Sequence, residues 1–246
     1  MLIVFSSIVV LGLSQFVIQK EQQSAISRTT LNLIDNAHAG IHYSIYNYRW
    51  RDLAANGGFF LGQFTVSGNN KFSVDGTDAQ LLMVRTDTAA SGGAGPPAGQ
   101  DLINVTIQNA NRSSSITIAT MTVTFTGGSN LTQIRINGAN QWTGAAASPV
   151  AADITDFVLN TTPTIYAVTR LRFSASIAAQ TVTVAFNMSD GSSRTVTLLP
   201  LSNHNDFTVD VSGHYTGSSA YRTLEADYNT LTSKVTRFVE VNTLIP

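Results

Sequence analysis

The sequence predicts an α+β fold: a long N-terminal α-helix, followed by an antiparallel β-rich head that includes an inserted Ig-like β-sandwich. Two observations lead to this prediction. Residues 1–18 are apolar and uncharged, and apolar side chains then recur at steps of three and four residues as far as Tyr48, which is typical of a helix. From Phe59 onward the repeat changes to two residues, which is typical of strands with one buried face.

The helix is predicted to cover residues 1–55, because Asn56-Gly57-Gly58 follows as a stop signal. Its expected apolar stripe comprises Ile26, Leu33, Ile34, Ala37, Ile41, Ile45 and Tyr48. The polar positions between them are Arg28, Asn32, Asp35, Asn36 and Asn47. A helix of roughly 50 residues measures about 75 Å at 1.5 Å per residue, too long for a small core, so its first half must project.

Residues 1–18 resemble a membrane anchor more than a secretory signal peptide, because they have neither a basic start nor an A-x-A-like cleavage site. As a helix they would span about 27 Å, close to the roughly 30 Å of a hydrocarbon core. We therefore expect Met1 to lie near a processed N-terminus.

The β-rich part divides into three regions. Residues 56–88 and 205–246 are expected to form one head sheet against the helix, residues 89–100 form a Gly- and Pro-rich linker, and residues 101–204 form the inserted sandwich. The head strands are expected at Phe64–Val66, Phe72–Val74, Leu82–Val84, Phe207–Val211, Tyr221–Tyr228 and Lys234–Val241. The sandwich strands are expected at Ile103–Ile107, Ile116–Phe125, Ile134–Ile136, Tyr166–Phe173, Thr181–Phe186 and Arg194–Leu198.

The composition excludes several kinds of chemistry. Only 12% of the 246 residues are charged, against a usual 25% or so, and the net charge is −1, which argues against binding nucleic acid through a basic patch. The absence of cysteine excludes disulfides, zinc–thiolate sites and a cysteine nucleophile.

Few residues suggest catalysis or metal binding. His38 and His42 have the i, i+4 spacing of two zinc ligands, but the glutamate of the H-E-x-x-H motif and a third ligand are missing. His204 and His214 flank Asp206 and Asp210, which suits either acid–base chemistry or a solvated loop. The sequences Asp75-Gly-Thr-Asp78 and Asp190-Gly-Ser-Ser could offer oxygen ligands to calcium, although turn residues explain both. We expect no enzyme activity and no cofactor or metal.

Five N-x-S/T sequons lie in the predicted sandwich, and each is a possible glycosylation site unless it arises by chance from the Asn-, Ser- and Thr-rich composition. Their asparagines are Asn104, Asn111, Asn130, Asn160 and Asn187.

The two ends of the chain resemble bacterial type IV pilins, most closely the minor-pilin-like group. The resemblance rests on Gln19-Lys20-Glu21-Gln22-Gln23, on Arg28 and on Asn36-Ala37-His38-Ala39-Gly40-Ile41-His42-Tyr43. In the tail it rests on a Ser212-Gly213 turn, on Arg222-Thr223-Leu224-Glu225-Ala226 and on a last strand that ends near Glu240. Phe5 stands where most bacterial pilins have glutamate, and the usual C-terminal cysteine pair is absent. Archaeal filament subunits also lack that glutamate, so an archaeal-type pilin is a possible relative.

The resemblance implies a structural subunit of an extracellular type IV pilus-like helical filament that serves adhesion or motility. Its partners would be copies of itself, a prepilin peptidase and an inner-membrane assembly machinery, and the helix would lie in that membrane before assembly. The expected assembly core comprises Met1, Phe5, Val9, Leu11, Gly12, Leu13 and Phe16. The alternative is a single-pass membrane-anchored adhesin or binding module whose Ig-like sandwich recognises a surface or a glycan; a secreted enzyme fits poorly.

Overall fold

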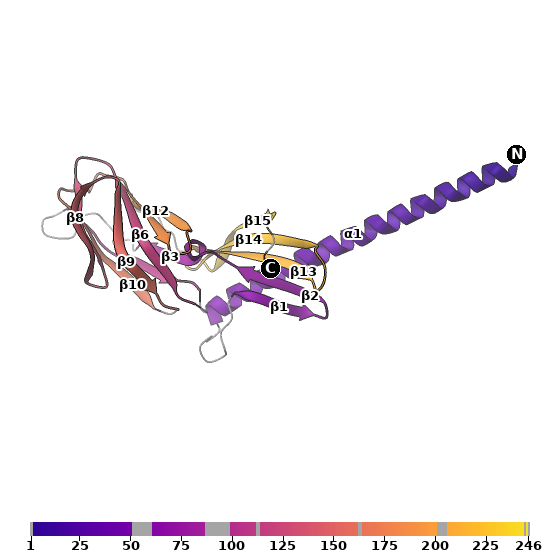
Figure 1. The fold of residues 1–246 in the computed structure, drawn as a ribbon, viewed down its shortest axis with the longest axis horizontal. Helices are drawn as coiled ribbons and strands as arrows, with labels where there is room; N and C mark the ends of the chain where they lie inside the picture. The colour runs from indigo at the N-terminus through magenta and orange to yellow at the C-terminus, as the bar shows by residue number, and fades with distance from the viewer. Residues whose placement is uncertain are drawn as a thin grey trace.

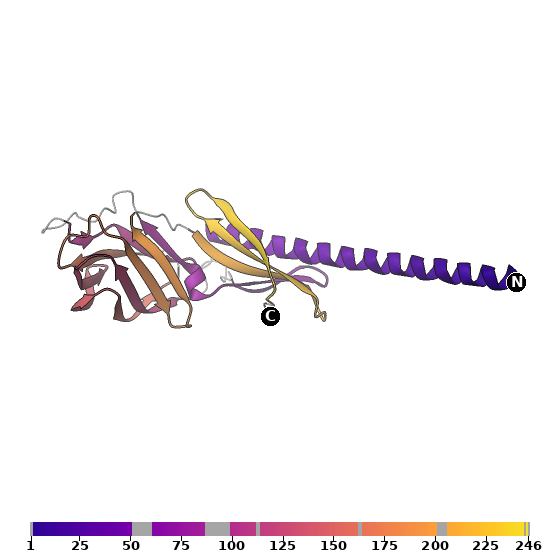
Figure 2. The ribbon, with the colours of Figure 1, turned by 90° about the horizontal axis from the view of Figure 1, so that it is seen from above.

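The computed structural model describes residues 2–50, 61–86, 99–111, 114–161, 164–200, 206–243 and 245. Helix α1 (Leu2–Trp50) is 49 residues long and projects from one end of an elongated molecule (Figures 1 and 2). A five-stranded sheet covers the last turns of α1, and two further sheets lie at the opposite end of the molecule (Figure 1). The prediction of an N-terminal helix followed by antiparallel sheets is thus confirmed.

The sheet beside the helix, called the head sheet below, combines strands from both ends of the chain. In spatial order its strands are β1 (Gly62–Ser67), β2 (Asn70–Asp75), β13 (Asp206–Tyr215), β14 (Tyr221–Asn229) and β15 (Lys234–Val241), and all neighbours are antiparallel. Strands β2 and β13 meet through a register that pairs Val74 with Val211 and Phe72 with Gly213. The chain therefore leaves the head sheet after β2 and returns to its centre with β13.

The C-terminal half of α1 packs on β2, β13 and β14. Leu33, Ala37 and Ile41 are buried there, and Tyr48 packs on Phe207 with ring centroids 4.8 Å apart. The apolar stripe expected in the sequence therefore packs on the head sheet from Leu33 onward, with Ile34, Ile45 and Tyr48 partly buried, but Ile26 remains 67% exposed. Asn36 and Asn47, expected on the polar side, are buried too, and the Asn47 amide donates to the Tyr43 carbonyl at 2.7 Å. The stop signal at 56–58 lies outside the described residues.

Two glycines allow this close packing. A Cβ on Gly213 would overlap the Leu33 carbonyl oxygen and come within 2.8 Å of the Ala37 nitrogen. A Cβ on Gly40 would overlap Val211 and lie 2.7 Å from the Phe72 ring. The expected turn at Ser212-Gly213 is therefore wrong: both residues lie inside β13, and the glycine is required because the helix backbone passes directly over it.

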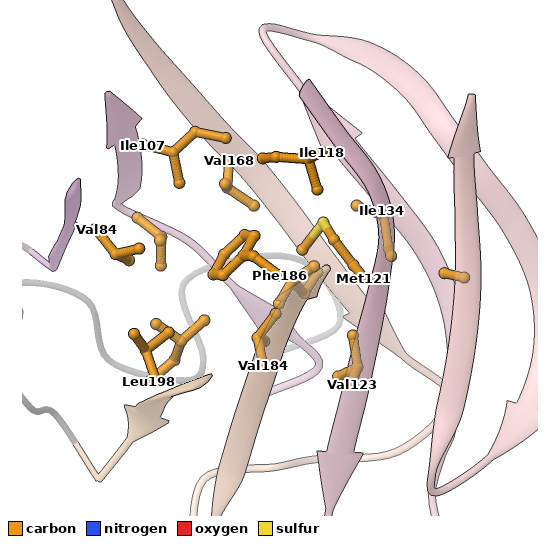
Figure 3. Packing of buried hydrophobic residues seen from close by; sticks show 14 of the residues in the cluster. Val84, Ile107, Ile118, Met121, Val123, Ile134, Val168, Val184, Phe186 and Leu198 are labelled. Carbon is orange, nitrogen blue, oxygen red and sulfur yellow. The ribbon is translucent and has the colours of Figure 1, made fainter. Parts of the chain in front are cut away.

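The other two sheets form an antiparallel β-sandwich. One contains β3 (Leu82–Thr86), β5 (Val105–Asn109), β10 (Ile165–Phe173), β7 (Asn130–Ile136) and β8 (Ala139–Ala147), with β4 (Asp101–Leu102) paired to β10. The other contains β12 (Ser193–Leu199), β11 (Val182–Met188), β6 (Ile116–Phe125) and β9 (Val150–Leu159). Inward-facing side chains such as Met121, Phe186 and Ile134 fill the space between the sheets (Figure 3).

Strand β3 departs from the prediction. We expected Leu82–Val84 in the head sheet, but β3 pairs with β5 and belongs to the sandwich. Its side chains alternate between two cores: Leu82 and Val84 join the sandwich core, whereas Met83, like Leu81 before it, joins the core under α1. A strand whose two faces are both buried carries no sequence signal for either sheet.

The sequence also missed four elements: β4, β8, β9 and the short helix α2 (Asp78–Leu81). Helix α2 begins with a capping box: the Thr77 hydroxyl accepts a hydrogen bond from the backbone nitrogen of Gln80, and the Gln80 side-chain oxygen accepts one from the backbone nitrogen of Thr77. Of the predicted linker 89–100, only Gly99 and Gln100 are among the described residues, and both hydrogen-bond to the sandwich through their carbonyl groups.

Replacing Gly213 with alanine should destabilise the head, because the new methyl group would collide with the backbone of α1. Overpacking of this kind typically costs about 1–3 kcal/mol, and here backbone rather than a flexible side chain must move. Urea unfolding measures the loss. Gly128→Ala is the matched control, since nothing lies within 4 Å of its new Cβ; equal stability of the two variants would contradict the close helix–sheet approach.

Candidate assembly surface

The projecting half of α1 is the main exposed apolar surface in the described part of the chain. Every side chain from Ser14 to Arg28 is exposed, including Phe16, Val17 and Ile18, each more than half exposed. Figure 2 shows this part of the helix extending away from the head without contact to any other element. Large apolar side chains left in water on one stretch of helix indicate an interaction surface.

The seven residues expected in the assembly core lie on this half of the helix or at its start. Met1 lies outside the described residues, and α1 runs continuously through Phe5, Val9, Leu11, Gly12 and Leu13, whose side chains are not described. Phe16 is 57% exposed, and the Lys20 ammonium lies 5.5 Å from its ring centroid. Within the part of the chain that was described, no helix is both long enough and apolar enough to cross a membrane.

A groove of about 780 Å³ lies where α1 leaves the head. One wall is the helix, and the other is made by the β13–β14 turn and the ends of β14 and β15. Its lining comprises Ala25, Ile26, Thr29, Thr30, Leu33, 219–223 and 240–242. Arg222 and Glu240 form an ion pair of 3.2 Å at this site, and both side chains are about half exposed. Sequence reasoning missed the groove, because no local pattern shows that residues 25–33 and 219–242 meet.

Strand β15 forms one edge of the head sheet and is exposed along almost its whole length. Phe238 faces the helix and stacks on His38, with ring centroids 4.8 Å apart. His38 therefore serves packing, and the zinc spacing of His38 and His42 finds no third ligand: among the described residues, no three His, Asp or Glu side chains gather closely enough to hold a metal ion.

The other face of the head sheet is polar and largely acidic. Asp75, Asp210 and Glu225 lie side by side on three neighbouring strands. Burial raises the pKa of Asp210 above its ordinary value of 3.8, and the Glu225 and Asp75 carboxylates raise it further, against the lowering effect of Gln80 and Arg237. Burial and the nearby Lys71 lower the pKa of His214, whose ring nitrogen lies 3.1 Å from the Ser73 hydroxyl. His204 lies outside the described residues, so the choice between acid–base chemistry and a solvated loop stays a prediction for that residue.

The two sequences considered for calcium meet at the junction of head and sandwich. The Asp190 carboxylate accepts hydrogen bonds from the backbone nitrogens of Asp78 and Ser192, both at 2.9 Å, and from the Ser192 hydroxyl at 2.6 Å. Burial works to raise the pKa of Asp190, but these hydrogen bonds outweigh it and lower the value. The carboxylate thus caps α2 and joins the head to the sandwich, and both of its oxygens already accept hydrogen bonds from the protein.

The sequon asparagines differ in accessibility. Asn104 and Asn160 are exposed, and Asn130 is half-buried. The Asn111 side chain is buried and donates to the Ser114 hydroxyl at 2.7 Å, and the Asn187 amide donates to the hydroxyls of Thr120 and Thr122. A glycan on Asn111 or Asn187 would break these hydrogen bonds, so Asn104 and Asn160 are the most accessible candidates.

Comparison with known proteins supplies no identification, since no protein-family model, curated protein or solved structure matches the chain.

Removing the Asp210 charge should stabilise the head at neutral pH. Because the folded state raises this pKa, the carboxylate favours folding when protonated, and its unfavourable effect grows as the pH rises above the ordinary value of 3.8. Asp210→Asn should therefore raise the urea midpoint at pH 7 and reduce the fall in midpoint that accompanies a rise in pH from below 3.8 to neutrality. Asp35→Asn, on an exposed helix position, is the control; an Asp210→Asn midpoint below that of the wild-type protein would contradict this account.

Proposed function

We propose that this chain is the structural subunit of an extracellular, type IV pilus-like helical filament, assembled through its apolar N-terminal helix. The observation that supports the proposal is the division of α1 into two halves. From Leu33 onward one face of the helix is buried on the head sheet, whereas from Ser14 to Arg28 every side chain is exposed and the preceding residues are uncharged and apolar.

Bundling of the helices from many copies would remove this apolar surface from water. Burial of apolar surface is worth about 25 cal/mol per Å², so a helix of this length can supply the main driving force for assembly. In this arrangement α1 is the pilin stalk, the head sheet surrounds the bundle, and the sandwich, as an Ig-like module, faces outward. Before assembly the apolar segment would lie in the inner membrane, where a prepilin peptidase and the assembly machinery would act on it.

The charge-poor surface of the head fits close neighbours. With only 29 charged side chains in 246 residues, identical heads can crowd together without strong mutual repulsion. Adhesion or motility would then be properties of the filament. The exposed sequon residues Asn104 and Asn160 both belong to the outward-facing sandwich.

Electron microscopy of material sheared from the producing cells tests the proposal. Filaments labelled by an antibody against the sandwich are expected. Monomers found only in the membrane fraction would instead favour the anchored adhesin or binding module.

Leu13→Asp should abolish the filaments. The substitution places a carboxylate in the uncharged segment 1–18, where bundling would bury it among identical helices without a partner. A penalty of about 3 kcal/mol per subunit lowers association roughly 100-fold. Thr124→Asp, at an exposed position of β6 in the sandwich, is the matched control and should leave filament number unchanged. Normal filaments from Leu13→Asp would refute the helix-core arrangement.

A further inference from the structure

The groove beside α1 changes character along its length. The end of the groove nearest the N-terminus of α1 is lined by Ala25 and Ile26, and Ile26 is 67% exposed. The Arg222–Glu240 ion pair lies closer to the head, because Arg222 pairs with Gly213 and Gly213 abuts Leu33. From the N-terminal side toward the head, the groove therefore presents an apolar surface first and a pair of opposite charges next.

The exposed helix segment before the groove presents the same order. Phe16 and Val17 are followed one turn later by Lys20 and Glu21, and at about 100° per residue these four side chains occupy a single arc of about 140°. The Lys20 ammonium beside the Phe16 ring shows that the apolar and charged side chains of this arc are neighbours. The arc carries one charge of each sign, as does the groove.

We propose that the Phe16, Val17, Lys20 and Glu21 arc of one copy binds the groove of a neighbouring parallel copy. Phe16 and Val17 lie against Ala25 and Ile26, while Lys20 pairs with Glu240 and Glu21 pairs with Arg222. The inference rests on the proposed function, and it adds the contact that sets the spacing of the subunits. Since residue 16 of one copy lies level with residue 25 of the next, neighbouring copies are offset by nine residues, or about 14 Å along the helix axis.

The occupant must be a second copy. Helix α1 is continuous from Leu2 to Trp50, so Phe16 stays nine residues, or about 14 Å along the axis, from Ala25 of the same chain. The neighbouring helix must run parallel, because both the arc and the groove present apolar side chains first and charged side chains next. An antiparallel neighbour would place Lys20 and Glu21 over Ala25 and Ile26. The half-exposed ion pair in the groove needs little rearrangement to accept a second pair of charges.

Engineered disulfides test this contact cleanly, because the chain contains no cysteine. Val17→Cys combined with Ile26→Cys should give a ladder of covalent multimers when sheared filaments are oxidised and run on a non-reducing gel. Within one chain these positions are too far apart for a disulfide, whose Cα atoms lie within about 7 Å. Val17→Cys with Ala145→Cys, an exposed position on β8, is the control and should give no ladder.

Charge reversal provides a second, independent measurement. Glu240→Lys should reduce filament yield severalfold by placing like charges opposite Lys20, and Lys20→Glu combined with Glu240→Lys should restore it. This test decides the question if the cysteine pair itself blocks assembly.

The outcomes separate the two proposals. A ladder from the Val17→Cys and Ile26→Cys pair, or restoration by the double charge reversal, supports the groove contact. The groove contact is overturned if the wild-type chain forms filaments, the cysteine variant gives no ladder although its cysteines react with maleimide, and the double charge reversal does not restore filament yield. That result leaves the filament proposal intact. A wild-type chain that forms no filaments overturns both.

Discussion

The direct contact between the backbones of α1 and β13 is the constraint on which the rest of the structure depends. Gly213 and Gly40 lack the side chains that would hold helix and sheet apart, so Leu33 and Ala37 lie directly on the strand. At this distance polar helix residues must also be buried, and Ser44 and Asn47 satisfy their side chains on the carbonyls of the preceding helix turn. The fixed contact sets the direction in which the projecting half of α1 leaves the head.

The same rigidity extends to the sandwich through β3. Because Leu82 and Val84 face one core and Met83 faces the other, head and sandwich share a strand as well as a covalent connection. Arg194 reinforces this junction: its guanidinium donates to the Leu82 carbonyl at 2.5 Å and pairs with Asp206, the first residue of β13, at 3.1 Å. The sandwich is therefore held at a defined orientation at the end opposite the projecting helix.

The sequence predicted elements whose pattern is local and strong. Strands β6 and β15 were placed with the bounds that the structure shows, since apolar and polar residues alternate in β6 and a turn over residues 230–233 precedes β15. Strand β8 was missed because its alanine-rich sequence is mostly exposed and does not alternate. In β9 the alternation breaks at Thr155 and Asp156, which have positive φ angles.

Other misses come from tertiary contacts or from the shortness of an element. Ser212-Gly213 has the composition of a turn, and only the helix above it explains a glycine inside a strand. The capping box of α2 starts a helix of only four residues, too short for any periodicity. The candidate surface was predicted in part: the apolar start of the helix is visible in the sequence, whereas the groove depends on residues brought together from positions 25–33 and 219–242.

Apolar contacts alone would leave the spacing of a helical assembly undefined. An apolar helix can slide along another with little change in buried area, so burial supplies affinity but no preferred offset, and charges at defined positions supply that specificity. Between Ser14 and Arg28 the only charged residues are Lys20, Glu21 and Arg28. Two of these three stand together one turn after Phe16 and Val17, and the groove of the head offers one charge of each sign. A chain so poor in charge can fix the register of its assembly with two ion pairs, because few other charges compete for the same partners.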